Sequence, residues 1–301
     1  MQLQRIGLIG YGEVGKTFGA GLRSQVLPVA AWDLKFAADD TRVATAQRAH
    51  ATQAGILACD GMAALCAACD LLICAVTASQ TLEVARQAAA HLRPGTVFLD
   101  LNSASPATKQ QAAAGFEAAG GRYVEAGVMT SVPPYGIRVP MLLGGPHAAE
   151  LAPVLTGWGM DATVVSDQLG VASAIKMCRS VMIKGLEALV IESYTTARRY
   201  GVEDHMIPTL QETFPGIDWQ QVGAYFFSRV VQHGQRRAEE MRESAHTVRE
   251  AGFEPFMAAA IAGKQQWVAD RAKAGVFDGV DTKHSAWQVY ADRLIGDRGA
   301  H

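Results

Sequence analysis

Three glycines and an aspartate near the amino terminus have the types and spacing of a dinucleotide-binding site. Gly10, Gly12 and Gly15 form a G-x-G-x-x-G turn. The turn directly follows the apolar run Ile6–Ile9, and Asp33 closes the next apolar run. In such turns the glycines let the backbone bend tightly and approach a pyrophosphate, the helix amino terminus attracts the phosphates, and the acid binds the adenosine ribose. Because the acid would also repel a 2′-phosphate, we expect the chain to bind NAD, and NADP less favourably.

Two later turns are expected where the ribose and nicotinamide of such a cofactor would lie. One contains Val76 and Thr77, and the other contains Asn102 and Ser103. An asparagine just after a strand can hydrogen-bond both a cofactor amide and a substrate hydroxyl. Ser105 has a structural alternative, since it can cap a helix that begins with a proline. The expected cofactor contacts are Gly10, Tyr11, Gly12, Glu13, Val14, Gly15, Asp33, Val76, Thr77, Asn102 and Ser103.

A lysine in an apolar helical stretch has the chemistry of a general acid or base. Lys176 lies in residues 171–183, which are otherwise broken only by small hydroxyls and Arg179. A partly desolvated lysine gives up its proton more readily, which suits proton exchange with an alcohol. Ser173 and Ser180 share its helix face and could orient the amine. From the residues alone, a lysine whose stem packs while its ammonium reaches solvent is an equally good interpretation.

With these motifs in this order, nearly the whole chain resembles the β-hydroxyacid dehydrogenases, which include 3-hydroxyisobutyrate and 6-phosphogluconate dehydrogenases. The resemblance rests on the glycine turn, on the D-x-N-S turn at residues 100–103 and on the G-x-x-x-x-x-K segment that begins at Gly170. It implies that Lys176 is the catalytic lysine and that Asn102 and Ser103 touch the nicotinamide and the substrate. It also implies that residues 125–131 hold the substrate carboxylate.

The chain departs from this family in three places. Met129, Thr130 and Ser131 replace the usual Ser-Gly-Gly of the substrate loop. Arg179 and Ser180 stand where asparagine normally follows the lysine, and two glutamates replace a later Lys-Asp pair. We therefore expect a divergent subgroup with a poorly characterised phosphogluconate-dehydrogenase-like C-terminal domain. The expected catalytic residues are Lys176, Asn102 and Ser180, and the expected substrate contacts are Met129, Thr130, Ser131, Arg179 and His233.

Three charged or titratable residues of the carboxyl-terminal half keep two interpretations. Arg179 could bind a carboxylate or phosphate, or it could be a solvated helix charge. His233 could reach the substrate, although a lone histidine is more often structural. Lys184 lies two helical turns beyond Lys176 and could take the role of Lys176 or that of Arg179.

The elements that must position these residues follow two different patterns. Alternating apolar runs and helical stretches predict parallel βαβ units, and hence an α/β Rossmann domain over residues 1–166. Helical periodicity from residue 167 onward predicts an all-α domain over residues 167–301, joined by a long helix over Val171–Tyr200. The expected strands are residues 6–9, 26–32, 71–76, 97–101, 123–128 and 139–143, and the expected later helices are residues 219–234, 235–251, 255–273 and 283–294.

Composition narrows the class of protein. Hydrophobic residues make up 49% and charged residues 19% of the chain, which is typical of a globular protein. A net charge of −2 gives no reason to expect nucleic acid or an anionic membrane as partner. Five cysteines are an odd number, so we expect free thiols and a cytoplasmic protein. A helical domain without a core of its own would favour a homodimer.

These observations predict an NAD-dependent oxidoreductase that transfers a hydride between nicotinamide and a 3-hydroxy acid, or its keto or semialdehyde form. Lys176 would be the general base in oxidation and the general acid in reduction, and no metal would be required. An imine reductase is the nearest alternative, but the retained lysine argues against it. A non-catalytic NAD-binding sensor is the second alternative, because the altered substrate loop is compatible with lost turnover.

Overall fold

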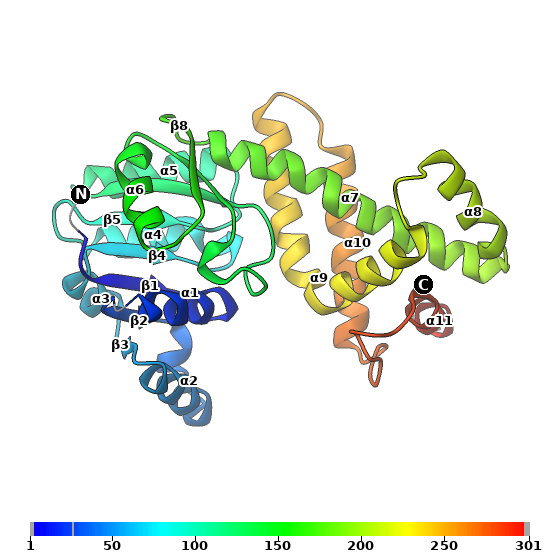
Figure 1. The fold of residues 1–301 in the computed structure, drawn as a ribbon, viewed down its shortest axis with the longest axis horizontal. Coiled ribbons are helices and arrows are strands. Elements are labelled where there is room, and N and C mark those ends of the chain that lie inside the picture. Colours follow the sequence, from blue (N-terminus) through cyan, green and yellow to red (C-terminus); the bar gives the residue numbers. More distant parts are fainter. Residues whose placement is uncertain (1–2, 26, 298–301) are drawn as a thin grey trace. The chain divides into compact units, whose positions relative to one another are not determined.

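The chain divides into two compact units in a computed structural model that describes residues 3–25 and 27–297. The first unit ends at Met177 and the second begins at Cys178, so the division falls within the long helix α7 (Val171–Tyr200). Figure 1 traces the chain through both units. The thirty-residue helix has the bounds that the sequence predicts.

An eight-stranded sheet forms the centre of the first unit, in the order β3-β2-β1-β4-β5-β6-β7-β8 (Figure 1). Strands β1 to β6 are parallel, which confirms the Rossmann-type α/β fold. The strand order reverses beside β1, and sheets of this kind bind ligands at the carboxyl ends of their strands next to such a point. The strands are β1 (Ile6–Ile9), β2 (Val29–Trp32), β3 (Leu57–Ala58), β4 (Leu71–Cys74), β5 (Val97–Asp100), β6 (Arg122–Val128), β7 (Met141–Gly144) and β8 (Ala162–Ser166).

The part of the sheet beyond β6 differs from the prediction that all strands are parallel. Strand β7 runs antiparallel to β6. The link between them contains Pro133 and Pro134 and only a short 3₁₀ turn, η3 (Gly136–Arg138), so it lacks the helical crossover that joins parallel neighbours. Strands β3 and β8 are short or exposed edge strands without a continuous apolar run, which is why the pattern missed them. The strand expected over residues 26–32 begins at Val29, and Val26 lies outside the described residues.

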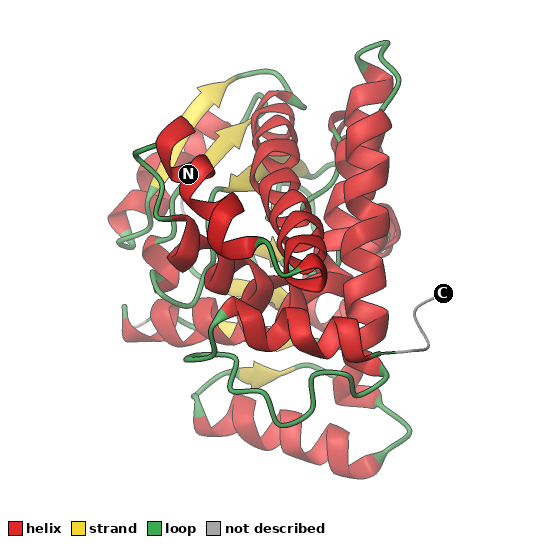
Figure 2. Cartoon of the chain, turned by 90° about the vertical axis from the view of Figure 1, so that its right-hand side faces the viewer, coloured by secondary structure: helices red, strands yellow, loops and turns green. Residues whose placement is uncertain are grey.

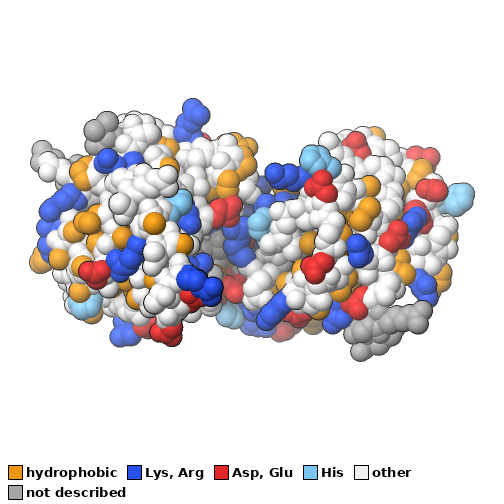
Figure 3. All heavy atoms as spheres, turned by 90° about the horizontal axis from the view of Figure 1, so that it is seen from below, with side chains coloured by type: hydrophobic (Ala, Val, Ile, Leu, Met, Phe, Trp, Pro, Cys, Tyr) orange, Lys and Arg blue, Asp and Glu red, His pale blue; other side chains and the backbone are white. Residues whose placement is uncertain are grey.

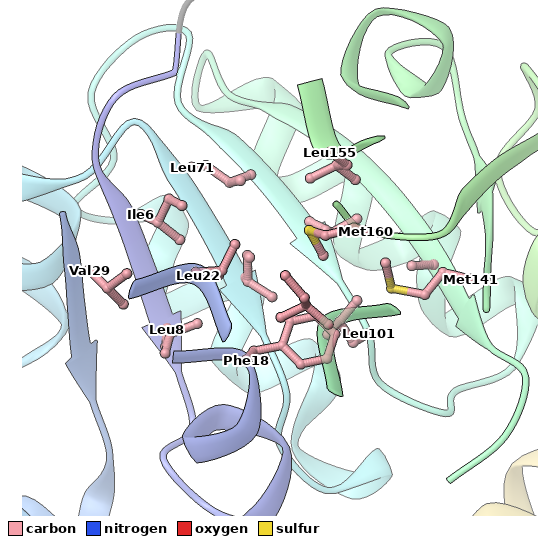
Figure 4. Close-up of a cluster of buried hydrophobic side chains, with 14 of the residues drawn as sticks. Ile6, Leu8, Phe18, Leu22, Val29, Leu71, Leu101, Met141, Leu155 and Met160 are labelled. Atoms are coloured by element: carbon pink, nitrogen blue, oxygen red, sulfur yellow. The ribbon is translucent and has the colours of Figure 1, made fainter. Parts of the chain in front are cut away.

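Apolar side chains cover both faces of the sheet, because alternate residues of a strand point to opposite sides. In β1, Ile6 and Leu8 belong to one buried cluster and Ile9 to the other. Figure 4 shows the first cluster, in which Phe18 and Leu22 reach the sheet from α1. Parallel sheets require this double cover. The helices of this unit before α7 are α1 (Glu13–Ser24), α2 (Thr41–Gln53), α3 (Met62–Ala68), α4 (Thr81–Ala89), α5 (Pro106–Ala118) and α6 (Ala148–Gly157).

The described residues of the second unit form helices joined by loops, without a strand (Figure 2). The expected break near residue 234 is absent, because α9 continues through it. A Cβ added at Gly234 would lie 2.9 Å from the carbonyl oxygen of Gln265, so this glycine lets α10 pack closely rather than ending a helix. After α7 come α8 (Glu203–Thr213), α9 (Trp219–Glu250), α10 (Phe256–Lys273) and α11 (Trp287–Gly296).

The second unit also has an apolar core of its own. Phe227, Val230, Trp287 and Tyr290 are almost completely buried within it. This corrects the premise from which the homodimer was expected, so the homodimer remains a prediction without that support. No described helix is both long and apolar enough to span a membrane. On the face shown in Figure 3, basic and acidic side chains are interspersed.

The cysteines are unpaired, as expected for free thiols. Burial raises the pKa of Cys66 to about 11 and that of Cys69 to about 12, so both thiols stay protonated and unreactive at neutral pH. Cys178 is exposed. The C-x-x-C spacing of Cys66 and Cys69 therefore reflects two buried small side chains.

A buried ion pair supports the turn after β5. The Nζ atom of Lys109 lies 2.9 Å from Oδ2 of Asp100, and both side chains are buried. The hydroxyl of Tyr123 donates to the same carboxylate, and the Asn102 N–H donates to its other oxygen at 2.9 Å. Burial, followed by the charge of Asp100, raises the pKa of Tyr123 well above its ordinary value, so the phenol remains a donor. The pair therefore holds the turn that carries Asn102.

Replacing Lys109 by methionine should destabilise the first unit strongly. The carboxylate of Asp100 would stay buried without its cation, and loss of one partner from such a pair costs about 3–5 kcal/mol of unfolding free energy. Urea denaturation of Lys109→Met measures this loss. Adding Asp100→Asn removes the second charge and should recover part of the stability. A Lys109→Met protein as stable as its parent would contradict this account of the pair.

Candidate functional site

The carboxyl ends of the parallel strands bring distant turns to one edge of the sheet. The Gly10 N–H donates to the carbonyl of Trp32 at 2.9 Å, and the Ala75 N–H donates to that of Ile9 at 2.9 Å. The Leu101 N–H donates to the carbonyl of Cys74 at 2.9 Å. These bonds join the ends of β1, β2, β4 and β5. The turns that hold the expected cofactor contacts therefore lie side by side.

Glycine is suited to the three positions of the first turn for different structural reasons. Gly10 has a left-handed backbone, with φ +92°, and a Cβ there would lie 2.5 Å from the carbonyl oxygen of Ala75. A Cβ at Gly15 would lie 2.0 Å from the carbonyl oxygen of Gly10. A Cβ at Gly12 would meet no atom within 4 Å. Gly12 is the N-cap residue of α1, and it has no side chain that could cap the N–H groups of the helix there. Gly12 therefore leaves open space at a helix amino terminus, where a pyrophosphate fits.

Asp33 lies beside this turn and is held by backbone groups. Its carboxylate accepts hydrogen bonds from the Tyr11 N–H at 2.6 Å and the Lys35 N–H at 2.8 Å. A carboxylate has about four acceptor positions, so two remain for ribose hydroxyls. The side chain of Tyr11 points away into the core and bonds His50 at 3.1 Å. Glu13 is exposed and Val14 is partly buried at the start of α1.

Asn102 is held more tightly than its position in a turn suggests. Its Oδ1 accepts from the Val76 N–H at 2.7 Å, and its Nδ2 donates to Sγ of Cys74 at 3.3 Å. The side chain is 4% exposed. These bonds tie the turn after β5 to the turn after β4, which also contains Thr77. Ser103, the next residue, is partly buried.

Two neighbouring segments complete this edge. The hydroxyl of Ser105 accepts from the Thr108 N–H at 3.3 Å, so it has the expected capping role at α5. The substrate-loop residues follow the end of β6, and the Met129 N–H donates to the carbonyl of Pro140 at 2.9 Å. Met129 and Ser131 are partly buried, whereas Thr130 is exposed.

Glu125 joins the middle of β6 to the amino terminus of α7. Its side chain is fully buried. One carboxylate oxygen accepts from the Gly170 N–H at 2.7 Å and the Ala172 N–H at 3.0 Å, and the other accepts from the Ser173 hydroxyl. Helix amino termini carry N–H groups without intrahelical acceptors and a partial positive charge, so they stabilise a carboxylate. The contact fixes the first turn of α7 against the sheet.

Lys176 lies one turn beyond this cap, against the carboxyl end of β6. A Cβ at Gly127 would lie 3.5 Å from Cβ of Lys176 and 3.0 Å from the carbonyl oxygen of Ala172. The register pairs Asp100, the last residue of β5, with Glu125 of β6, so the turn with Asn102 begins beside the part of β6 that continues to Gly127. Lys176 is partly buried. The first unit therefore brings the expected lysine to the edge that carries the other turns.

The remaining predicted residues belong to the second unit. Ser180 is buried, and its hydroxyl accepts from Nζ of Lys184 at 3.1 Å. Lys184 also forms an ion pair with Glu240, with Nζ 2.8 Å from Oε2. Arg179 is exposed, and His233 is partly buried on α9.

Glu125 belongs to the stretch expected to hold the substrate carboxylate, but its buried side chain bonds the start of α7 instead. The supporting roles of Asp100 and Lys109 were not predicted from the sequence. An isolated charge within a buried strand requires partners, and this rule could have singled out both acids. It could not have named the partners, because Glu125 bonds a residue 45 positions away. Among the described residues, no cluster of three or more histidine, cysteine or acidic side chains could hold a metal ion.

The different environments of Gly12 and Gly15 give a matched pair of variants. Gly15→Ala would force a methyl group into the carbonyl of Gly10 and should lower the unfolding temperature sharply. Gly12→Ala meets no protein atom, so it should keep the stability of its parent. Its methyl group would occupy the space for the pyrophosphate, and we expect NADH affinity to fall at least tenfold. Thermal denaturation and NADH fluorescence titration measure both effects, and undiminished affinity in Gly12→Ala would contradict this placement.

Comparison with known proteins agrees with the architecture. Residues 5–165 match the model of the NAD-binding domain of 6-phosphogluconate dehydrogenase. Residues 197–268 match a domain of unknown function, DUF1932. A conserved hypothetical protein from Sinorhizobium meliloti is 37% identical, with a TM-score of 0.74 over 97% of this chain and 96% of that chain.

Two further structures connect this architecture to dehydrogenases. A conserved protein of unknown function, whose structure shows similarity to 3-hydroxyacid dehydrogenases, is 30% identical over 90% of this chain and 98% of that chain, with a TM-score of 0.67. The Mycobacterium tuberculosis 3-hydroxyisobutyrate dehydrogenase shares the fold, with a TM-score of 0.69 over 97% of this chain and 99% of that chain at 16% identity. The chain therefore belongs to the family with the NAD-binding domain of 6-phosphogluconate dehydrogenase, combined with a DUF1932 domain in a 3-hydroxyacid-dehydrogenase-like fold.

Proposed function

We propose that the protein is an NAD-dependent oxidoreductase that interconverts a 3-hydroxy acid and its keto or semialdehyde form. The observation that carries this proposal is the place of Lys176. Glu125 and Gly127 hold this lysine at the edge of the sheet where the glycine turn and Asn102 also lie. A glycine turn alone would support binding only, whereas a lysine at the same edge supports proton transfer as well.

The residues of the first unit fit a dinucleotide. The open space at Gly12 and the amino terminus of α1 would hold the pyrophosphate, and the free acceptor positions of Asp33 would hold the adenosine ribose. The negative charge of Asp33 disfavours a 2′-phosphate, which supports NAD over NADP. When bound, the nicotinamide supplies the site that gives or receives the hydride.

Lys176 would complete the reaction by moving the proton. In reduction its ammonium donates a proton to the substrate carbonyl oxygen, and in oxidation its amine accepts the hydroxyl proton. Asn102 has one amide N–H beyond the one that bonds Cys74, and it would offer this group to the same oxygen. Ser131 and the exposed Thr130 would hold the acidic end of the substrate, beside Met129.

The test measures turnover on a panel of 3-hydroxy acids. Nicotinamide absorbance monitors the reaction, with NAD and NADP in parallel. We expect turnover with at least one acid and a preference for NAD. Lys176→Met should lower kcat by a factor of about 10² or more, the usual range for loss of a general acid or base, while NADH affinity is unchanged.

Three outcomes would contradict the proposal. Full turnover in Lys176→Met would exclude this lysine as the proton carrier. NADH binding without turnover on any hydroxy acid would favour the sensor, and turnover on imines alone would favour an imine reductase.

A further inference from the structure

The contact between Glu125 and α7 has features that a simple helix cap does not need. A serine, threonine or aspartate next to the helix would satisfy its first N–H groups from within the same segment. Here the acceptor comes from a central strand, 45 residues earlier in the chain, and it is fully buried. Burying a carboxylate is costly unless all its bonds are made. The contact therefore fixes the position of α7 against the sheet as well as capping its amino terminus.

Two glycines of the sheet leave the space that this contact requires. A Cβ at Gly144 would lie 2.5 Å from Oε1 of Glu125. A Cβ at Gly127 would press on the carbonyl of Ala172 at 3.0 Å and touch Cβ of Lys176 at 3.5 Å. Both glycines belong to the paired strands β6 and β7. The helix can thus lie directly on the backbone at the level of the lysine.

The hydroxyl of Ser173 extends the contact along the helix face. It donates to the second oxygen of Glu125 and lies one turn before Lys176, on the same side of α7. Three bonds to one carboxylate restrain both the translation of α7 and its rotation about its own axis. Rotation is the movement that would turn the lysine away from the edge of the sheet.

We infer that Glu125 is a positioning residue for the proposed reaction, on which this inference rests, and that it sets the place of Lys176 through the amino terminus of α7. Ser173 and Gly127 are the other parts of the same device. Loss of these contacts would leave the cofactor site intact, because the bonds of Glu125 to α7 involve neither the glycine turn nor Asp33. A displacement of about 1 Å at a reacting group can cost on the order of 10²-fold in rate.

Two readouts test this role on the full chain. Hydrogen exchange followed by mass spectrometry should show exchange at the amides of residues 170–177 at least tenfold faster in Glu125→Ala. Turnover with the best hydroxy acid should show kcat lowered about 10²-fold, with NADH affinity within twofold of the parent. Glu125→Gln keeps an acceptor for both N–H groups and should recover part of kcat.

Two variants separate positioning from stability. Leu155→Ala removes a buried side chain that makes none of the bonds to Glu125, so it should lower the unfolding temperature while keeping kcat. Gly127→Ala adds only a methyl group beside Lys176 and should lower kcat at least tenfold in a folded protein. Faster exchange in Glu125→Ala with unchanged kcat, or unchanged kcat in Gly127→Ala, would overturn the inference. A parent protein without turnover would instead contradict the proposed function, and the exchange pattern distinguishes this case.

Discussion

A buried carboxylate at the amino terminus of a thirty-residue helix is the constraint on which the candidate site depends. Glu125 cannot remain charged inside the sheet without donors, and α7 supplies them through two backbone N–H groups and a hydroxyl. The carboxylate of Glu125 thus gains the donors that it needs, and the first N–H groups of α7 gain an acceptor. Because Lys176 lies one turn further along, this local pairing places the lysine relative to the sheet.

The same edge shows a second buried charge used as a support. Asp100 and Lys109 neutralise each other beneath the turn that carries Asn102, and the amide of Asn102 in turn bonds the turn after β4. Asp100 and Glu125 are paired residues of the neighbouring parallel strands β5 and β6. The buried carboxylates of Asp100 and Glu125 therefore hold Asn102 and the start of α7. These bonds do not use the glycine turn, which stays open for a ligand.

Features carried by short, contiguous patterns could be predicted from the sequence, as the glycine turn and α7 illustrate. The direction of β7 could not, because it depends on a proline-containing link without a helix. The continuity of α9 could not either, since Gly234 serves the close packing of α10 rather than a break. At the site, the spacing identified Lys176 and Asn102 as candidates. The partner of Glu125 is set by three-dimensional packing, which local periodicity does not encode.

The central claim is that the Lys176 side chain carries the proton at this edge of the sheet, and chemical rescue tests it most directly. Lys176→Ala leaves a space that small primary amines can enter, so turnover of this variant is measured at rising concentrations of ethylamine. The account predicts a saturable recovery of kcat with ethylamine and none with tetramethylammonium at the same ionic strength. An active parent whose Lys176→Ala variant turns over without amine, or never responds to it, would contradict the account.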